Sequence, residues 1–245
     1  MTPIPISVVV QERSNVEKIT LAERQYMHEL VFTLGLALVS SHKVARELAR
    51  VSLLDGTVDQ PTLDARAQEI QNYLLLQFPI VEFTASPESK DPVYAWPDRD
   101  DRLLHLQKSE RQRIRHTIFV NVLLYAELNR VHLRRASGLY ISYYEPTYES
   151  FLIFFLMVCM LHELGHIVRT VFSAKPTPPK YNPSSKEFYE GEAGFDVERW
   201  VLGGRVILGY SPEHSDKSNI RQWENVKVIG FQTAHKTYYL SCEQK

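Results

Sequence analysis

His162-Glu163-Leu164-Gly165-His166 is the stretch that decides how this chain is interpreted. Histidines four residues apart lie on the same face of an α-helix, about one turn from each other. Both imidazoles can therefore reach one metal ion from a single rigid element. Glu163 lies about 100° further round the helix, so it flanks the ion and is placed to act as a general base on a metal-activated water. The sequence predicts a metal site with His162 and His166 as ligands and Glu163 as the catalytic residue.

The surroundings of this stretch strengthen the prediction. A random chain of this length contains HExxH with a probability on the order of one in a hundred. The segment ahead of it, Phe151 to Leu161, is continuously apolar. This run is far shorter than the roughly 20 residues of a membrane span, so we expect a buried helix over about 147–172. Polar groups at the buried end of such a helix need a reason, because unpaired polar groups are costly there. The alternative is an amphipathic helix whose polar side carries the pattern by chance.

A third ligand is expected downstream, because a catalytic zinc usually takes three protein ligands and a water. Glu192 and Asp196 are four residues apart on a predicted helix that opens at the capping box 184–187 and ends at Gly203-Gly204. We predict Glu192 as the ligand and Asp196 as the acceptor for the free N–H of a ligand histidine. Glu190 is the alternative ligand, and a solvated, acidic helix start is the alternative interpretation of Glu192 and Asp196.

Glycines on either side of Glu192 bear on the packing of the two helices. Gly191 and Gly194 carry no side chain. We therefore expect them to let the downstream helix approach the histidine-bearing helix closely.

HELGH followed by Glu192-Ala193-Gly194-Phe195-Asp196 resembles the gluzincin type of zincin metallopeptidase, in which HExxH is followed by a glutamate and, four residues later, an aspartate. The resemblance covers roughly residues 147–203. It implies a zinc ion held by His162, His166 and Glu192, with Glu163 as general base and Asp196 as supporting acid. It also implies a zincin-like fold with the active-site helix in the core, and hydrolysis of peptide bonds in a peptide or protein substrate.

Two further features of such a site have several candidates. Amide hydrolysis needs a donor for the oxyanion, which the resemblance implies is a downstream tyrosine or histidine. The candidates are Tyr189, His214, His235, Tyr238 and Tyr239. Zincin-like folds also bind extended peptide on an edge strand beside the active-site helix. Ile118–Asn121 is the candidate for that strand, with an ordinary core strand as the alternative.

The remaining patterns predict an α+β fold, mainly helical with a small mixed sheet. The 245 residues form a single domain, or an N-terminal helical region (residues 1–100) and a catalytic region (residues 101–245). The expected elements are a strand at 6–10, helical sequence from Thr20 to about Leu54, a helix at 62–76, a strand at 80–83, a loop at 86–100, a strand at 117–121, a helix at 122–135, and strands at 205–210 and 226–239. One continuous helix from Glu110 is the alternative for the segment around 117–135.

The amino-acid composition limits the classes of function that we expect. A net charge of -1 with 44% hydrophobic and 23% charged residues is ordinary for a globular protein and gives no reason to expect a nucleic-acid or membrane partner. The basic stretch from Lys108 to Arg115 is interleaved with Glu110 and is expected to be a solvated face. The N-terminus lacks the pattern of a signal peptide, which predicts an intracellular protein.

Two other functions share the HExxH pattern. One is a zincin-like scaffold that binds zinc without catalysis, against which the retained Glu163 argues. The other is a haem- or iron-dependent, oxygenase-like protein, against which the acids Glu192 and Asp196 argue.

Overall fold

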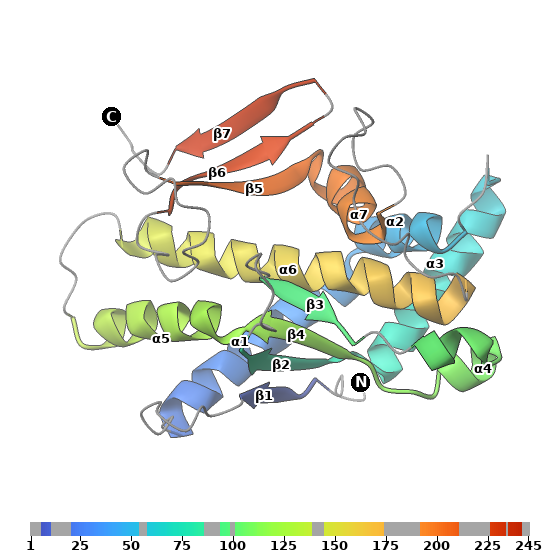
Figure 1. Cartoon of the computed structure of the whole chain (residues 1–245), viewed down its shortest axis with the longest axis horizontal. Helices are drawn as coiled ribbons and strands as arrows, with labels where there is room; N and C mark the ends of the chain where they lie inside the picture. The colour runs from blue at the N-terminus through green and yellow to red at the C-terminus, as the bar shows by residue number, and fades with distance from the viewer. Residues whose placement is uncertain are drawn as a thin grey trace.

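A computed structural model describes residues 6–10, 21–53, 58–85, 94–98, 101–138, 145–173, 192–210, 226–233 and 235–241. Helices predominate and two small sheets accompany them, which confirms the α+β prediction (Figure 1). In chain order the elements are β1 (Val8–Val10), α1 (Leu21–Ser40), α2 (His42–Leu53), α3 (Gln60–Leu76), β2 (Ile80–Thr84), β3 (Ala95–Pro97), the 3-10 helix η1 (Asp101–His105), α4 (Lys108–Arg111), β4 (Thr117–Asn121), α5 (Val122–Ala136), α6 (Glu145–Ser173), α7 (Ala193–Leu202), β5 (Arg205–Tyr210), β6 (Val226–Gln232) and β7 (Thr237–Ser241).

Helix α6 runs through the middle of the molecule, between the two sheets in the view of Figure 1. Its side chains Leu152, Leu156, Met160, Leu161 and Leu164 are completely buried. By length and composition, residues 148–173 could cross a membrane, but 78% of the most apolar window is buried inside the protein. This burial confirms the prediction of a core helix over 147–172, and it explains why the stretch from Phe151 to Leu161 is apolar on every side of the helix.

The first sheet has the strand order β1-β2-β4-β3, in which β1, β2 and β4 are parallel and β3 is antiparallel to β4. The prediction of Ile118–Asn121 as an edge strand is therefore wrong, because β4 lies between β2 and β3. Ile118 and Val120 are fully buried, as expected of a central strand. The edge beside α6 is β3, which falls in the segment predicted to be a loop. Its Pro97 fits an edge position, since proline has no N–H that could pair with a second neighbouring strand.

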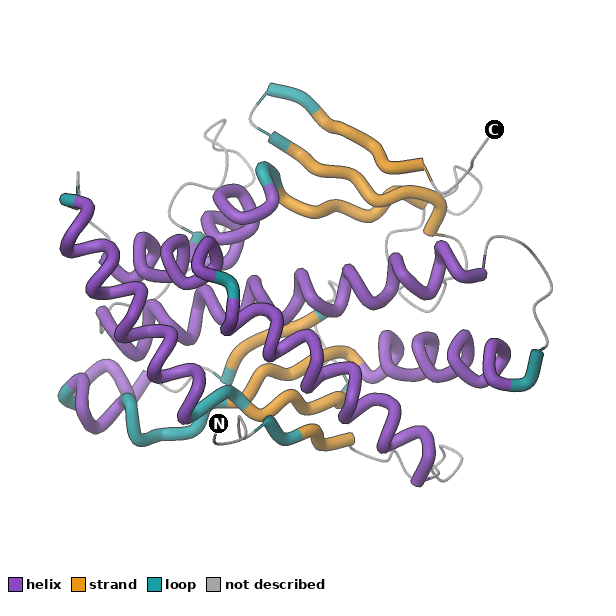
Figure 2. Tube along the Cα trace, turned by 180° about the vertical axis from the view of Figure 1, so that it is seen from behind, coloured by secondary structure: helices purple, strands orange, loops and turns teal. Residues whose placement is uncertain are grey.

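The second sheet is an antiparallel meander of β5, β6 and β7. It packs against α6 through contacts such as that of Phe154 with Phe231, whose ring centroids are 6.1 Å apart. The predicted strand at 226–239 is two strands, because Thr233 and Lys236 close a turn in which Thr233 N–H donates to the Lys236 carbonyl at 2.8 Å. Figure 2 shows the resulting hairpin from behind.

Local capping explains where two helices begin. The predicted helical segment after Thr20 is divided at Ser41, whose hydroxyl accepts a hydrogen bond from Val44 N–H at 3.3 Å and so starts α2. Asn121 ends β4 and caps α5, accepting from Leu123 N–H at 3.0 Å. This cap supports the predicted strand and helix over the alternative of one helix from Glu110.

One hydrophobic core includes residues from the N-terminal helices and from the helices around the histidines, among them Met27 of α1, Leu48 of α2 and Ala193 of α7. Arg111 departs from the predicted solvated face. It is 5% exposed, and its Nε donates to the Val171 carbonyl at 2.9 Å. The buried guanidinium donates to a carbonyl in the last turn of α6, which has no partner within the helix. Its positive charge also interacts favourably with the negative end of the helix dipole.

Candidate metal centre

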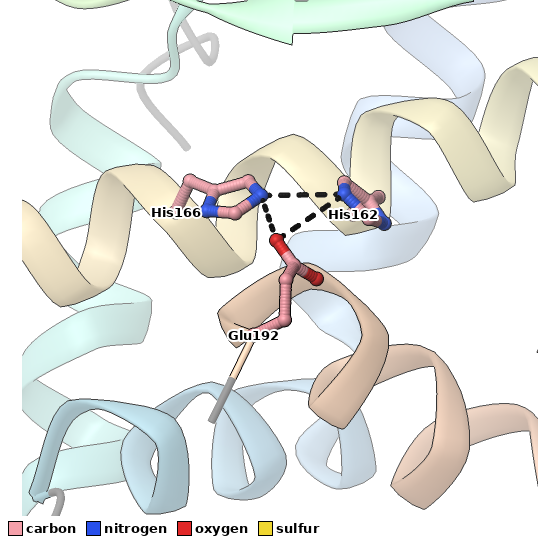
Figure 3. A group of neighbouring side chains, drawn as sticks. All are labelled: His162, His166 and Glu192. Atoms are coloured by element: carbon pink, nitrogen blue, oxygen red, sulfur yellow. Dashed lines mark hydrogen bonds and ion pairs between the residues drawn. The ribbon is translucent and has the colours of Figure 1, made fainter. Parts of the chain in front are cut away.

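The side chains of His162 and His166 on α6 converge with the side chain of Glu192, which lies directly before α7. His162 Nε2 and His166 Nε2 are 3.2 Å apart (Figure 3). Glu192 Oε1 lies 2.6 Å from His166 Nε2 and 3.8 Å from His162 Nε2. The three side chains offer one ligand atom each, all within 4.8 Å of one another. The structure therefore brings together the three residues that the sequence singled out as ligands.

This triangle fits a tetrahedral zinc ion. Zinc binds histidine nitrogen and carboxylate oxygen at roughly 2.0–2.2 Å, so ligand atoms around a tetrahedral ion lie about 3.3 Å apart. The nitrogen–nitrogen distance of 3.2 Å is close to that value. The two distances to Glu192, 2.6 and 3.8 Å, lie on either side of it. A small movement of one carboxylate would equalise them around an ion.

Glu192 stands at the N-cap of α7 and not inside a helix. Its backbone is extended, with φ -84° and ψ 111°, and its Oε2 accepts from Phe195 N–H at 2.7 Å. One oxygen thus begins the helix while the other, Oε1, faces the histidines. The prediction of one helix running from the capping box at 184–187 through Glu192 is wrong, because the extended backbone at Glu192 interrupts any helix there. The capping box itself, Glu190 and Gly191 lie outside the described residues.

The acid that supports His162 is Glu198. Its Oε1 lies 2.6 Å from His162 Nδ1, and its Oε2 accepts from Val206 N–H at 2.8 Å. Glu198 is 3% exposed. Bonded in this way, Nδ1 carries the proton and Nε2 is left to face the other ligands. The prediction gave a role of this kind to Asp196, whose Oδ1 instead lies 3.1 Å from Arg199 Nη2.

Glycines make the contact between α6 and α7 possible. A Cβ added at Gly194 would lie 2.4 Å from the His162 ring, and one at Gly165 would lie 2.8 Å from the Ala193 carbonyl oxygen. Real Cβ atoms essentially never come this close to a nonbonded atom, so a side chain at either position would force the two helices apart. The expectation of a close approach is confirmed for Gly194, while the equivalent role of Gly165 was not predicted from the sequence.

Gly194→Ala is expected to weaken zinc binding strongly, because the new methyl group displaces the His162 ring from its position beside Glu198. The measurement is zinc affinity by competition with a chelator dye. Gly203→Ala is the matched control. Gly203 ends α7 with φ 88°, and a Cβ there meets nothing within 4 Å. The control should lose stability through backbone strain but keep its zinc affinity. Equal zinc affinity in Gly194→Ala and wild type would contradict the close contact.

The shifted pKa values of two ligand side chains indicate that this site favours a cation. Burial acts to lower the pKa of His162, but the hydrogen bond with Glu198 and the charges of the neighbouring acids raise it to about 9. Burial acts to raise the pKa of Glu192, whereas the hydrogen bond with His166 and the charges of both histidines lower it to about 2. The carboxylates of this cluster therefore stay ionised and favour a positive charge on His162. A divalent ion would supply that positive charge in place of the proton on the imidazole.

A cavity of about 430 Å³ opens beside the metal centre. His162, Glu163 and Glu198 form its polar side. The other lining residues come from β3, α6, α7 and β5, and they are mostly apolar: Tyr94, Ala95, Phe155, Val158, Cys159, Phe195, Arg205, Val206, Ile207 and Leu208. Glu163 is 3% exposed and is not one of the three converging ligands. This is the position expected of a base that acts on a molecule in the cavity.

Of the predicted oxyanion donors, the three that the structure describes, His235, Tyr238 and Tyr239, are not among the residues that line this cavity. His235 is exposed at the turn between β6 and β7, and Tyr238 is 56% exposed on β7. Tyr189 and His214 lie outside the described residues. Two donors that were not predicted from the sequence, Tyr94 and Arg205, line the cavity. The Arg205 guanidinium lies 4.1 Å from the centre of the Phe195 ring, which in turn packs edge-on against His162.

Comparison of the chain with family models, with curated proteins and with solved structures gave no match. The function is therefore inferred from the geometry of the site. A group of His162, His166 and Glu192 that can hold a metal ion is the observation on which that inference depends.

Glu198→Gln is expected to lower zinc affinity by about 10- to 100-fold, the usual cost of losing a partner that orients a ligand histidine. Glutamine has one acceptor, while Glu198 accepts from both His162 and Val206. Its amide nitrogen must therefore face one of two N–H donors. Asp196→Asn is the matched control on the same helix and should keep wild-type affinity. A loss in Asp196→Asn that equals the loss in Glu198→Gln would contradict the assignment of Glu198.

Proposed function

We propose that the protein is a zinc-dependent metallopeptidase with a zincin-like fold of the gluzincin type. The observation that carries the proposal is the convergence of His162, His166 and Glu192 beside a cavity that Glu163 lines. The ligands come from a core helix and from the N-cap of a helix packed across it. Three protein ligands leave a fourth position of a tetrahedral ion for water or substrate, as catalytic zinc sites require.

Each residue has a distinct role in the proposed reaction. Bound at this site, zinc would supply a water made acidic near neutral pH and a Lewis acid for the scissile carbonyl. Glu163 accepts the proton of the attacking water and later delivers it to the leaving amine. Glu198 holds His162 in the tautomer that presents Nε2. Tyr94 and Arg205 are the proposed donors to the oxyanion, because both line the cavity.

The sheet edge beside α6 supports a peptide as substrate. β3 lies at the edge of the first sheet, and its Ala95 lines the cavity together with His162 and Glu163. An extended peptide can add to such an edge through backbone hydrogen bonds. The apolar lining of the cavity, which includes Phe155 and Val158, suits an apolar side chain of that peptide.

Iron chemistry is the second candidate, since two histidines and one carboxylate are also the donor set of non-haem iron(II) sites. Glu163 favours the hydrolase. A carboxylate directly beside a ligand histidine is the group that proton transfer from water needs, and neither an iron site nor a structural zinc site has a use for it. A zincin-like scaffold without catalysis would likewise leave Glu163 buried without a role.

Metal analysis combined with cleavage profiling tests the proposal. Purified protein is expected to contain zinc in a 1:1 ratio and to cleave members of a peptide library, with the Glu163→Gln protein as the blank. A haem absorbance band, or iron in place of zinc, would favour the second candidate. Zinc without cleavage of any library member would favour the scaffold.

A further inference from the structure

Arg205 places a positive charge on the wall of a cavity that acids border. Among the described residues that line the cavity, Arg205 alone has a lysine or arginine side chain, while Glu163 and Glu198 carry carboxylates. Glu192, whose Oε1 lies 2.6 Å from His166 Nε2, adds a third carboxylate beside it. Charges act strongly on one another where water is partly excluded, so this arrangement discriminates between charged ligands.

The Arg205 side chain is positioned at both of its ends. Its backbone begins β5, where it pairs with Gln232 of β6. The next N–H, that of Val206, donates to Glu198 Oε2 at 2.8 Å. The guanidinium lies 4.1 Å from the centre of the Phe195 ring. A guanidinium that packs on an aromatic face keeps its N–H groups in its own plane, where they can donate to a ligand. Positioning the cation in advance lowers the entropy cost of binding.

The distance from Arg205 to a metal ligand limits where a bound anion lies along the substrate. The centre of the Phe195 ring is 4.1 Å from the Arg205 guanidinium carbon and 4.8 Å from the centre of the His162 ring. The guanidinium is therefore no more than about 9 Å from the His162 ring. An extended chain covers about 3.3–3.6 Å per residue, so two or three residues span that distance.

We propose that Arg205 binds a carboxylate of the substrate, on a residue within about three of the scissile bond. This inference rests on the proposed peptidase function, and it narrows the substrates to peptides with an anionic group near the cleaved bond. The carboxylate is the C-terminus of the peptide or the side chain of an aspartate or glutamate. Each of these offers the two oxygens with which a guanidinium forms a bidentate pair.

The acids of the site restrict this carboxylate to the side of the cavity where Arg205 lies. Close to Glu163 or Glu198, a substrate carboxylate meets a like charge, which disfavours its ionised form. A lysine or arginine side chain of the substrate is disfavoured beside Arg205 for the corresponding reason. The apolar wall that includes Phe155 and Val158 accepts a neutral side chain.

The guanidinium has enough donors for this carboxylate and for the oxyanion. It presents five N–H groups, and a bidentate carboxylate uses two of them. Another can donate to the oxyanion, the role proposed for Arg205 in catalysis. The two roles can be separated by experiment. An oxyanion donor acts on every substrate, whereas a carboxylate site acts only on substrates that carry the carboxylate.

Matched probes test the proposal on the wild-type protein. All are dipeptides that contain leucine and carry a hydroxamate to bind the zinc, and calorimetry measures their affinity for the zinc-loaded protein. With the hydroxamate at the N-terminal end, leucyl-alanine is compared as carboxylate and as carboxamide. Leucyl-aspartate amide is compared with leucyl-asparagine amide in the same way. With the hydroxamate at the C-terminal end, acetyl-aspartyl-leucine is compared with acetyl-asparaginyl-leucine.

The anionic member of at least one pair is expected to bind about 10- to 100-fold more tightly than its neutral partner, the gain of a charge-assisted, bidentate hydrogen bond. The pair that shows the gain identifies the source of the carboxylate. Equal affinities within all three pairs overturn the inference and leave the peptidase function standing, which the comparison of wild type with Glu163→Gln decides. Failure of the zinc-loaded wild type to bind any probe overturns the inference as well.

Arginine variants test whether Arg205 is the group that binds the carboxylate. Arg205→Gln should abolish the preference for the anionic probe. Arg205→Lys should retain part of it, because lysine keeps the charge but not the planar pair of donors. Arg199→Gln is the matched control, since Arg199 lies on α7, 3.1 Å from Asp196, and is not among the residues that line the cavity. The control should keep the full preference. An unchanged preference in Arg205→Gln overturns the assignment.

Discussion

Glu163→Gln is expected to keep zinc and to lower kcat for peptide cleavage by about 10²- to 10⁴-fold, the usual contribution of a general base. Glutamine has nearly the same size as glutamate but cannot accept a proton near neutral pH. Glu163 is not one of the three converging ligands, so the metal should remain. KM should change little, because the lost interaction acts on the transferred proton and not on the bound peptide.

The measurement is kcat and KM on a peptide found by library profiling, together with zinc content by mass spectrometry. Glu149→Gln is a matched control. Glu149 is also an acid of α6, it is 3% exposed, and it pairs with Arg135 at 2.9 Å. That control should lower stability, because it leaves the Arg135 charge without its partner, and it should leave kcat unchanged. Wild-type kcat in Glu163→Gln would refute Glu163 as the base.

The core helix and the two histidines of the site were predictable because both depend on local sequence. An apolar run ending in HELGH determines both the burial of α6 and the common face of His162 and His166. Glu192 followed from the need for a third ligand. Strand β4 and helix α5 were also placed correctly, since Asn121 is both the end of a β-branched run and a good N-cap.

The acid that supports His162 could not be identified correctly without knowing where α7 begins. Had a helix run through Glu192, Asp196 would share its face. Glu192 is instead the N-cap, so its carboxylate reaches the histidines from the end of α7, and the inward face of the helix carries Glu198. The signal lay in an acid three residues before Phe195, whose N–H it caps. The capping pattern at 184–187 led instead to a predicted helix start further upstream in the sequence.

The edge strand was missed for a different reason. β3 has three residues, lies close to prolines and gains its regularity from pairing with β4. A strand of three residues is too short to show the alternation of apolar and polar residues by which strands are predicted. Which strand forms an edge is also a property of the whole sheet. The pairing of β4 along both of its edges is apparent only when β2 and β3 have been placed beside it.

Glu192→Ala is expected to lower zinc affinity by more than about 100-fold, because removing a ligand should cost more than the 10- to 100-fold typical of a supporting partner. The substitution also removes the cap on Phe195 N–H, which by itself destabilises α7. Glu192→Ser separates the two effects. Serine is a good N-cap but offers no carboxylate that could reach the histidines.

Both variants should therefore lose zinc to the same extent, while Glu192→Ser keeps more of the metal-free stability. The readout is the thermal unfolding midpoint with and without zinc. A ligand at 100 times its Kd stabilises a folded protein by about 2.7 kcal/mol, so wild type should show a clear zinc-dependent rise in Tm that both variants lack. If the rise persists in both variants, the third ligand is another residue, with Glu190 the first to test. If Glu192→Ser alone retained it, the role of Glu192 would be to cap α7 and not to bind the ion.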